Sequence, residues 1–159
     1  ERSSKLFPFS GIYSASKNLI DLEKNKKIDQ HVNLVSLFWD TVGDNMDQWR
    51  GVRIGNLSAT EVRRDYIHTH VIILQALGMA GKDLMSQFPN NWKTKIKNLK
   101  KINWLKNNPE WHQRVIVNGR VVKNSNSIIL AANLIKKALG VRLSVKEKAL
   151  ESKMKKNVK

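Results

Sequence analysis

The sequence has no cysteine and no long apolar run, and both absences exclude classes of protein. Without thiols the chain has no disulfide, no thiolate zinc site and no cysteine nucleophile. A membrane-spanning helix requires roughly 18–20 apolar residues, whereas the run Val71–Leu74 is soon followed by Gln75 and Gly78. We therefore expect a soluble cytoplasmic protein that has no membrane partner.

Motifs of common catalytic and cofactor sites are also missing. The chain has no GxSxG, no GxxxxGK phosphate loop and no GxGxxG, each of which positions a nucleophile or a phosphate by backbone geometry. His112 stands alone beside Trp111 and is predicted to be structural. The sequence thus predicts no catalytic residue, no metal and no cofactor, and it favours a role other than catalysis for this chain.

The chain of 159 residues has the length of one ordinary domain, which buries roughly 70% of its unfolded surface on folding. It begins with Glu1 rather than Met, and the first residues do not resemble a signal peptide. We therefore expect residues 1–159 to form a single helical domain that is a fragment of a longer protein.

Acidic residues are scarce in the second half of the chain. Residues 1–90 carry 11 Lys/Arg and 10 Asp/Glu, a net charge of +1, whereas residues 91–159 carry 18 and 3, a net charge of +15. A surface of that charge density favours a polyanionic partner such as nucleic acid. A solvated basic surface with no partner remains the alternative.

Hydrophobic spacing and capping residues predict a mainly α, compact domain of about six to seven helices. Ser58 with Glu61 and Ser144 with Glu147 fit capping boxes, and Gly78 and Gly140 fit helix C-termini. The pattern of residues 46–56 does not assign them to a helix, a strand or a loop. The expected helices cover residues 10–24, 28–43 with Ile28 and Val32 on the buried face, 59–77, 82–88, 91–105, from Ser125 or Ser127 to Leu139, and from Ser144 to about Met154, after which residues 155–159 fray.

Residues 115–122 carry the one strong β signal. Two short β-branched runs flank Asn118 and Gly119, the pair favoured in a type I′ turn, which requires positive φ at both central residues. The sequence therefore predicts one small β-hairpin near residues 115–122.

Arg63, Arg64 and His70 form a candidate anion or structural site in the stretch RRDYIHTHVIILQALGMAG. On a continuous helix His68 and His70 point about 160° apart, so they are not predicted to share a metal. His68 then faces outward, while His70 and Arg63 share the apolar face. Either Arg63 pairs with a carboxylate of another helix and His70 makes a core hydrogen bond, or both line a groove reached by an anionic partner.

Several short motifs along the chain, taken in order, resemble one known family. They are Arg2-Ser-Ser-Lys-Leu-Phe7 with Gly11-Ile-Tyr13-Ser-Ala-Ser-Lys17, Phe38-Trp39, Arg63 to His70, Gln75-Ala-Leu-Gly78 with Gly81, Gly119-Arg120-Val-Val-Lys123-Asn-Ser125, Ile135-Lys136 and Ala138-Leu-Gly140. Together they are similar to the C-terminal helical part of DndB, the regulatory member of the bacterial DNA phosphorothioation (DNA sulfur modification) system. The resemblance runs from Arg2 to about Leu143.

The resemblance implies a DNA-binding transcriptional regulator of the modification operon, with double-stranded DNA of the promoter region as its partner. In that family an N-terminal ParB-like region carries a DGQHR motif, which this sequence lacks. Chemistry that belongs to that motif therefore has no counterpart on these residues. The resemblance also leaves open that Arg63 and His70 complete a nucleotide-hydrolysing or nuclease site with the missing region.

Lysines and arginines of the second half are the candidate DNA-binding residues. Such side chains contact phosphates, which gives affinity without sequence readout. Trp104 and Trp111 are available either for stacking on bases or for the core, and the core is favoured. The candidate DNA contacts are Lys93, Lys95, Lys97, Lys100, Lys101, Arg120, Lys123, Lys136 and Lys137.

Residues 127–157 fit either a helix-turn-helix, with the turn at Gly140–Leu143, or an ordinary helical hairpin. A second functional hypothesis rests on the near-neutral, apolar first 90 residues. In that view the domain forms a homo-oligomer or docks on other DNA modification proteins, and DNA binding or catalysis belongs to the missing N-terminal region.

Overall fold

The computed structural model describes residues 5–20 and 28–156. Within these residues it contains eight α-helices, three short 3-10 helices and one two-stranded sheet, which confirms a mainly α domain with one small hairpin. The α-helices are α1 (Phe9–Leu19), α2 (Ile28–Asp44), α3 (Asp47–Arg53), α4 (Ala59–Asp65), α5 (Val71–Gln87), α6 (Trp92–Ile96), α7 (Ser125–Leu139) and α8 (Val145–Lys156). The 3-10 helices are η1 (Ile67–Thr69), η2 (Lys97–Lys101) and η3 (Pro109–Trp111), and the strands are β1 (Ile116–Val117) and β2 (Arg120–Val121).

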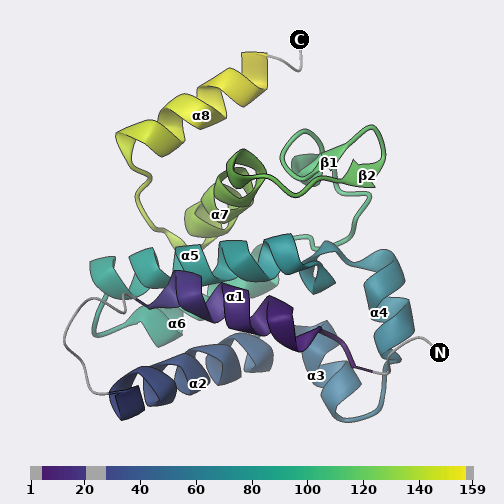
Figure 1. Ribbon diagram of the computed structural model, residues 1–159, viewed down its shortest axis with the longest axis vertical. Coiled ribbons are helices and arrows are strands. Elements are labelled where there is room, and N and C mark those ends of the chain that lie inside the picture. The colour runs from purple at the N-terminus through teal and green to yellow at the C-terminus, as the bar shows by residue number, and fades with distance from the viewer. Residues whose placement is uncertain (1–4, 21–27, 157–159) are drawn as a thin grey trace.

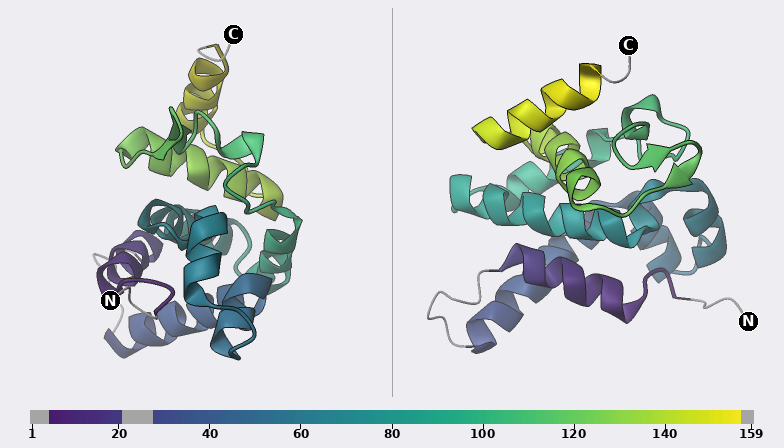
Figure 2. Two further views of the ribbon diagram at one scale, coloured as in Figure 1. Left: turned by 90° about the vertical axis from the view of Figure 1, so that its right-hand side faces the viewer. Right: turned by 45° about the horizontal axis from the view of Figure 1, so that its top comes forward.

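Helix α5 is the centre of the fold. It packs against α1 on one side and against α7 on the other, and Figures 1 and 2 show it lying between these two helices. Most of its side chains are buried, from Ile72 to Leu84. Helices α2 and α3 lie beyond α1, and α8 lies beyond α7, at the opposite end of the molecule (Figure 1).

Helix α5 continues through Gly78, where the sequence predicted a helix end. The two predicted helices 59–77 and 82–88 were therefore divided at the wrong place. A Cβ on Gly78 would lie 2.2 Å from the backbone oxygen of Ala15, and one on Gly81 would lie 2.4 Å from the ring of Phe38. These glycines serve close packing of α5 against α1 and α2, so they do not terminate the helix.

The predicted helix 59–77 instead breaks at Tyr66, whose φ of −112° and ψ of 138° are extended. The predicted helix 91–105 also ends early, since regular helix stops at Ile96 and 3-10 turns continue only to Lys101. The two segments in which the helices are interrupted lie side by side and hydrogen-bond to each other. Tyr66 forms an antiparallel bridge with Leu105, the Ile67 amide donates to the Trp104 carbonyl at 2.9 Å, and the Lys106 amide donates to the Asp65 carbonyl at 2.9 Å. Each break thereby satisfies backbone groups that the other exposes.

The hairpin prediction is confirmed in position and in turn type. Ile116 pairs with Val121 and Val117 with Arg120, in antiparallel register. Asn118 has φ of 50° and Gly119 has φ of 72°. Positive φ at both central residues is the conformation that a type I′ turn requires.

Helix boundaries differ from the predictions in several places. Helix α1 begins at Phe9 after Pro8, and residues 21–24 of the predicted helix lie outside the described residues. Asn124, rather than Ser125 or Ser127, caps α7 by accepting from the Ser127 amide at 2.8 Å. The predicted end of α7 is confirmed, since Gly140 has φ of 75° and follows Leu139 directly.

The predicted apolar stripe of α2 is buried only in its C-terminal half. Phe38 and Val42 are buried, whereas Ile28 and Val32 are 79% and 56% exposed. Phe38 packs beside Gly81 and Trp92, which places the buried part of α2 against α5 and α6. The prediction that Ile28 and Val32 face the core was therefore wrong.

Among the described helices, none has both the length and the apolar character needed to cross a lipid bilayer.

Candidate nucleic-acid interface

The segment formed by α6 and η2 carries five of the predicted DNA-binding lysines. Lys93, Lys97, Lys100 and Lys101 are exposed, and Lys95 is half-buried with its Nζ 3.9 Å from the centre of the Phe88 ring. The one ion pair of these lysines among the described residues joins Lys100 to Asp47 at 3.8 Å, and both of its side chains are largely exposed. The segment therefore presents cations that are free to meet phosphates.

The tryptophans of this region belong to the core. Trp92, Trp104 and Trp111 are all buried, and the rings of Trp104 and Trp111 stack with centroids 5.5 Å apart. Their indole N–H groups are engaged too, since Trp104 donates to the Leu99 carbonyl and Trp111 to the Asn103 carbonyl. Stacking of Trp104 or Trp111 on bases is therefore not available in this structure.

The hairpin supplies a second group of exposed cations, Arg120 and Lys123. Figure 1 shows the hairpin and α6 well separated, with α5 and α7 between them. The predicted DNA-binding residues consequently do not form one compact patch.

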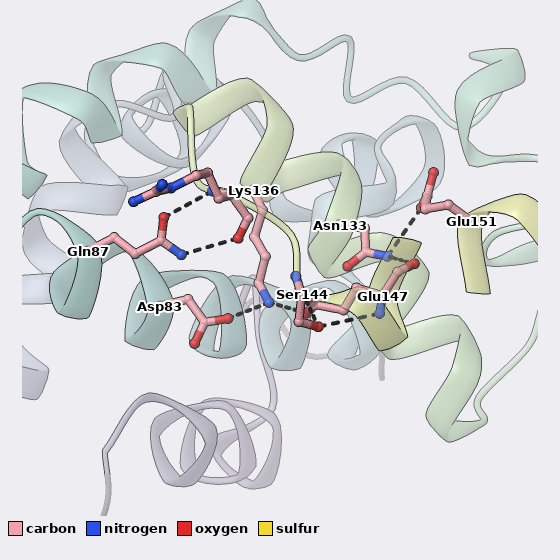
Figure 3. Close-up of polar contacts among 8 residues, drawn as sticks. Asp83, Gln87, Asn133, Lys136, Ser144, Glu147 and Glu151 are labelled. Atoms are coloured by element: carbon pink, nitrogen blue, oxygen red, sulfur yellow. Dashed lines mark hydrogen bonds and ion pairs between the residues drawn. The ribbon is translucent and has the colours of Figure 1, made fainter. Parts of the chain in front are cut away.

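Lys136 is 1% exposed and lies inside the molecule (Figure 3). Its Nζ forms ion pairs with Asp83 of α5 and Glu147 of α8. Glu147 also forms the predicted capping box, since Ser144 donates its backbone and side-chain hydrogens to that carboxylate, and the Glu147 amide donates to Ser144 Oγ. Lys136 therefore joins three helices and does not reach the surface, so it is not part of the candidate interface.

A second ionic cluster holds α8 on α7. The Glu151 carboxylate accepts from both terminal nitrogens of Arg114, one of them at 2.9 Å, and from Lys137 Nζ at 2.6 Å. Asn133 Nδ2 adds a bond to Glu151 at 3.3 Å. Burial opposes ionisation of Glu151, but the hydrogen bonds from Arg114 and Lys137 outweigh it and lower the pKa to about 2. Lys137 is exposed, but its ammonium group is already paired with Glu151.

Sequence reasoning missed this pair of clusters, which we call the α8 clamp (Arg114, Lys136, Lys137, Glu147 and Glu151). The available signal was the spacing of Glu147 and Glu151, four residues apart in a helix whose other charges are all positive. Residues four apart share a helix face. Of the three acidic residues in 91–159 only Glu110 remains exposed, so the clamp leaves the surface of this half almost purely cationic.

The candidate site at Arg63, Arg64 and His70 is taken up by internal contacts. Arg63 donates to the Lys5 carbonyl at 2.7 Å, and its own carbonyl accepts from Lys106 Nζ at 2.7 Å. Arg64 is exposed and forms a two-point pair with Asp65. The shared face predicted for Arg63 and His70 does not exist, because the helix break at Tyr66 separates them.

The predicted orientation of His68 was wrong for the same reason. His68 is fully buried among Trp49, Tyr66 and Trp104, and its Nδ1 accepts from Trp49 Nε1 at 3.0 Å. Burial, with a smaller contribution from His70, lowers the pKa of His68 to about 3. His70 is half-buried, and burial together with the charges of Lys106 and Lys123 lowers its pKa to about 4. Within the described residues no set of three metal-ligating side chains comes together.

Comparison with known proteins gives one match. The sequence model of the family described as DndB, DNA-sulfur modification-associated, matches residues 1–142. No curated protein and no solved structure matches the chain. The matched region ends just before α8, which begins at Val145.

Proposed function

Because the chain belongs to the DndB family of DNA-sulfur modification-associated proteins, we propose that its basic second half binds duplex DNA in the cytoplasm. In this role the chain is the DNA-binding part of a transcriptional regulator of the phosphorothioation operon. The simplest DNA target is the promoter of that operon. Contacts to phosphates supply the affinity, since the exposed cations lie on several elements rather than in one pocket.

The observation that carries this proposal is that the basic half has almost no carboxylate side chain on its surface. Two of its three carboxylates are turned inward by the α8 clamp. In the part of the chain that the structure describes, Lys93, Lys97, Lys101, Arg120 and Lys123 have no carboxylate partner. Such cations retain their full attraction for phosphates.

A salt titration tests the proposal directly. Binding of the chain to a promoter duplex and to a scrambled duplex is measured at 50 and 200 mM salt. Neutralising about six phosphates predicts a loss of affinity of ~10³-fold across this range. No binding, or a loss of only a few-fold, would overturn the phosphate-contact account. A preference for the promoter duplex supports an operator role, whereas equal binding restricts the proposal to sequence-independent contacts.

A charge-matched pair of variants locates the contacts. The triple variant Lys93→Ala, Lys97→Ala and Lys101→Ala is expected to lower the slope of log K against log salt by up to ~3. The control, Lys17→Ala, Arg50→Ala and Arg53→Ala, removes the same charge from exposed positions in the near-neutral half. Equal effects of the two variants would show that net charge, rather than α6 and η2, governs binding.

Self-association is a second candidate function, and exposed apolar side chains favour it. Ile28 and Val32 of α2 are largely exposed, and they line an apolar groove with Ile20, Val35 and His31. Clustered exposed apolar groups of this kind mark interaction surfaces. Light scattering at high concentration should show a dimer that the double variant Ile28→Glu and Val32→Glu dissociates. A chain that stays monomeric at high concentration would remove this candidate.

A further inference from the structure

Helix α8 has two faces of different composition. At 100° per residue, Glu147, Leu150, Glu151 and Met154 fall within an arc of about 100°. These four are the residues of α8 that are buried or half-buried, and every other residue of the helix is exposed. Leu150 and Met154 line a pocket with Leu130 of α7, and the two glutamates belong to the α8 clamp. All four inward-facing side chains therefore help to hold α8 against the rest of the protein.

The outward face carries two rows of lysine with small residues between them. Lys146 and Lys153 form one row, and Lys148 and Lys155 form the other, about 140–180° away around the helix. Within each row the lysines are seven residues apart, which is about 10.5 Å along the axis. Between the rows lie Ala149 and Ser152 in the middle of the helix and Val145 and Lys156 at its two ends, all of them exposed. The outward face is thus a ridge that is low in its middle, at Ala149 and Ser152, and has cations on both flanks.

From this arrangement we propose that α8 enters the major groove of duplex DNA. The major groove is about 12 Å wide and admits one α-helix. Lysine rows on opposite flanks then reach the phosphate backbones on the two sides of the groove. The small Ala149 and Ser152 allow the helix to approach the base edges. This inference rests on the DNA-binding function proposed above and specifies the element that makes the closest approach.

The α8 clamp is what makes the helix suited to this role. Both acidic residues of α8 point inward, so no carboxylate on the outer face repels a phosphate. The ion pairs join α8 to α5 through Lys136 and Asp83 and to α7 through Lys137, which holds the helix on a rigid support. Gln87 of α5 also exchanges two hydrogen bonds with the backbone of Arg142, in the turn that leads into α8 (Figure 3).

The geometry favours nucleic acid over a lipid surface. A helix that lies on a membrane directs a broad apolar face outward. The apolar Leu150 and Met154 of α8 instead face the protein, and Val145, at the first turn, is its only large apolar side chain that is mostly exposed.

Row-by-row lysine variants of the complete chain test the inference. The double variants Lys146→Ala with Lys153→Ala, and Lys148→Ala with Lys155→Ala, should each lower the salt slope of duplex binding by ~2, and the quadruple variant by ~4. The control Lys17→Ala with Arg50→Ala should leave the slope unchanged. If one row matters and the other does not, α8 lies along a single backbone and the groove placement is overturned.

A charge-neutral pair of variants tests close approach. Ala149→Trp adds bulk to the ridge between the rows, and is expected to weaken duplex binding at least ten-fold while leaving the fold intact. The control Ser86→Trp adds the same bulk at an exposed position of α5. Protection of guanine N7 from dimethyl sulfate should appear in the complex, because N7 lies in the major groove. Absence of that protection in a saturated complex would overturn the inference.

The outcomes separate this inference from the proposed function. If the unmodified chain does not bind duplex DNA, both fail. If duplex binding depends steeply on salt, and the Lys93, Lys97 and Lys101 variant weakens it whereas the α8 variants do not, only the inference about α8 fails. Binding to phosphatidylserine vesicles that depends on the α8 lysines, combined with duplex binding that does not, would assign α8 to lipid and also overturn it.

Discussion

At the scale of single residues, His68 shows how burial selects one protonation state. The Trp49 indole N–H donates to His68 Nδ1, so the ring proton must sit on Nε2 and the imidazole is neutral. Protonation of Nδ1 would break this bond and place a charge among three aromatic rings. The pKa of about 3 follows from that environment.

We predict that the fold loses stability as pH falls below the ordinary histidine range. The pKa of His68 is 6.5 before folding and about 3 after it. Because the neutral form is favoured in the folded state, its contribution is complete above pH 6.5 and declines towards pH 3, by up to ~1.4 kcal/mol per pH unit. His68→Gln keeps an acceptor for Trp49 and removes the titration. Urea unfolding at pH 7, 6 and 5 should therefore give a shallower pH slope for this variant than for the unmodified chain.

His70→Gln serves as the comparison, since the pKa of His70 is also lowered, to about 4. Each variant alone should reduce the slope, and the double variant should reduce it further. An unchanged slope in His68→Gln would contradict the assignment of a buried neutral imidazole.

At the scale of helices, the contact between α1 and α5 depends on Gly78. The helix has no space for even one methyl group there, because the obstructing atom is the backbone oxygen of Ala15. Backbone atoms cannot move aside as a flexible side chain can. The same helix carries Gly81 against Phe38 and Leu19, so two glycines in one turn set the distance between α5 and its neighbours.

Gly78→Ala is predicted to destabilise the fold by ~2 kcal/mol or more, since the added methyl must push α1 away. Gly43→Ala is the matched control. It lies in α2, and no atom lies within 4 Å of the position of its added Cβ. The control should be neutral or stabilising by ~0.5–1 kcal/mol, because alanine is the better helix former. Thermal and urea unfolding measure both. Equal stabilities of the two variants would contradict the close contact.

The attachment of α8 to α7 depends on Glu151 in a similar way. Removing its charge leaves the guanidinium of Arg114, whose side chain is 10% exposed, without its counter-charge. Unpairing a buried ion pair in this manner costs ~3–5 kcal/mol. Glu151→Gln is therefore predicted to weaken the attachment of α8. The amide hydrogens of residues 145–156 should exchange faster than in the unmodified chain, and those of α5 should be affected less.

Acid should have the same effect as this substitution. The folded pKa of Glu151, about 2, lies below its ordinary value of 4.5. The pairing is therefore complete above pH 4.5 and is lost as pH falls towards 2. Glu110→Gln is the control, because Glu110 is exposed. Unchanged exchange of α8 in Glu151→Gln would contradict the clamp.

At the scale of the whole molecule, positive and negative charges are separated along the sequence and again in space. Along the sequence the excess of cations lies in residues 91–159. In space, the structure then separates this half further, by moving Glu147, Glu151 and Lys136 to the interior and leaving lysines of α6, η2 and α8 outside. The basic surfaces lie at separate places on the molecule, with α6 and α8 on opposite sides of α5 and α7 (Figure 1). A long polyanion that wraps the domain suits this distribution better than a compact anion does.

Local signals in the sequence were sufficient for the parts of the structure that depend on neighbouring residues. The Asn118–Gly119 turn, the Ser58 and Ser144 capping boxes and the left-handed Gly140 were all predicted correctly, because each is determined by a few adjacent residues. The excess of positive charge in the second half is likewise a property of composition alone. Order of motifs along the chain also indicated the family that residues 1–142 match.

Only the tertiary structure decided where distant segments meet. The breaks at Tyr66 and after Lys101 arise because these two segments hydrogen-bond to each other, and helical periodicity contains no information on that pairing. For the same reason Gly78 was predicted to be a helix end although it is a packing contact. Lys136 and Lys137 were both predicted to be surface cations, but Lys136 is buried against Glu147, and Lys137 stays exposed while it pairs with Glu151. The amino-acid sequence determined how much positive charge this protein carries, and the packing of α8 decided which of those charges face the solvent.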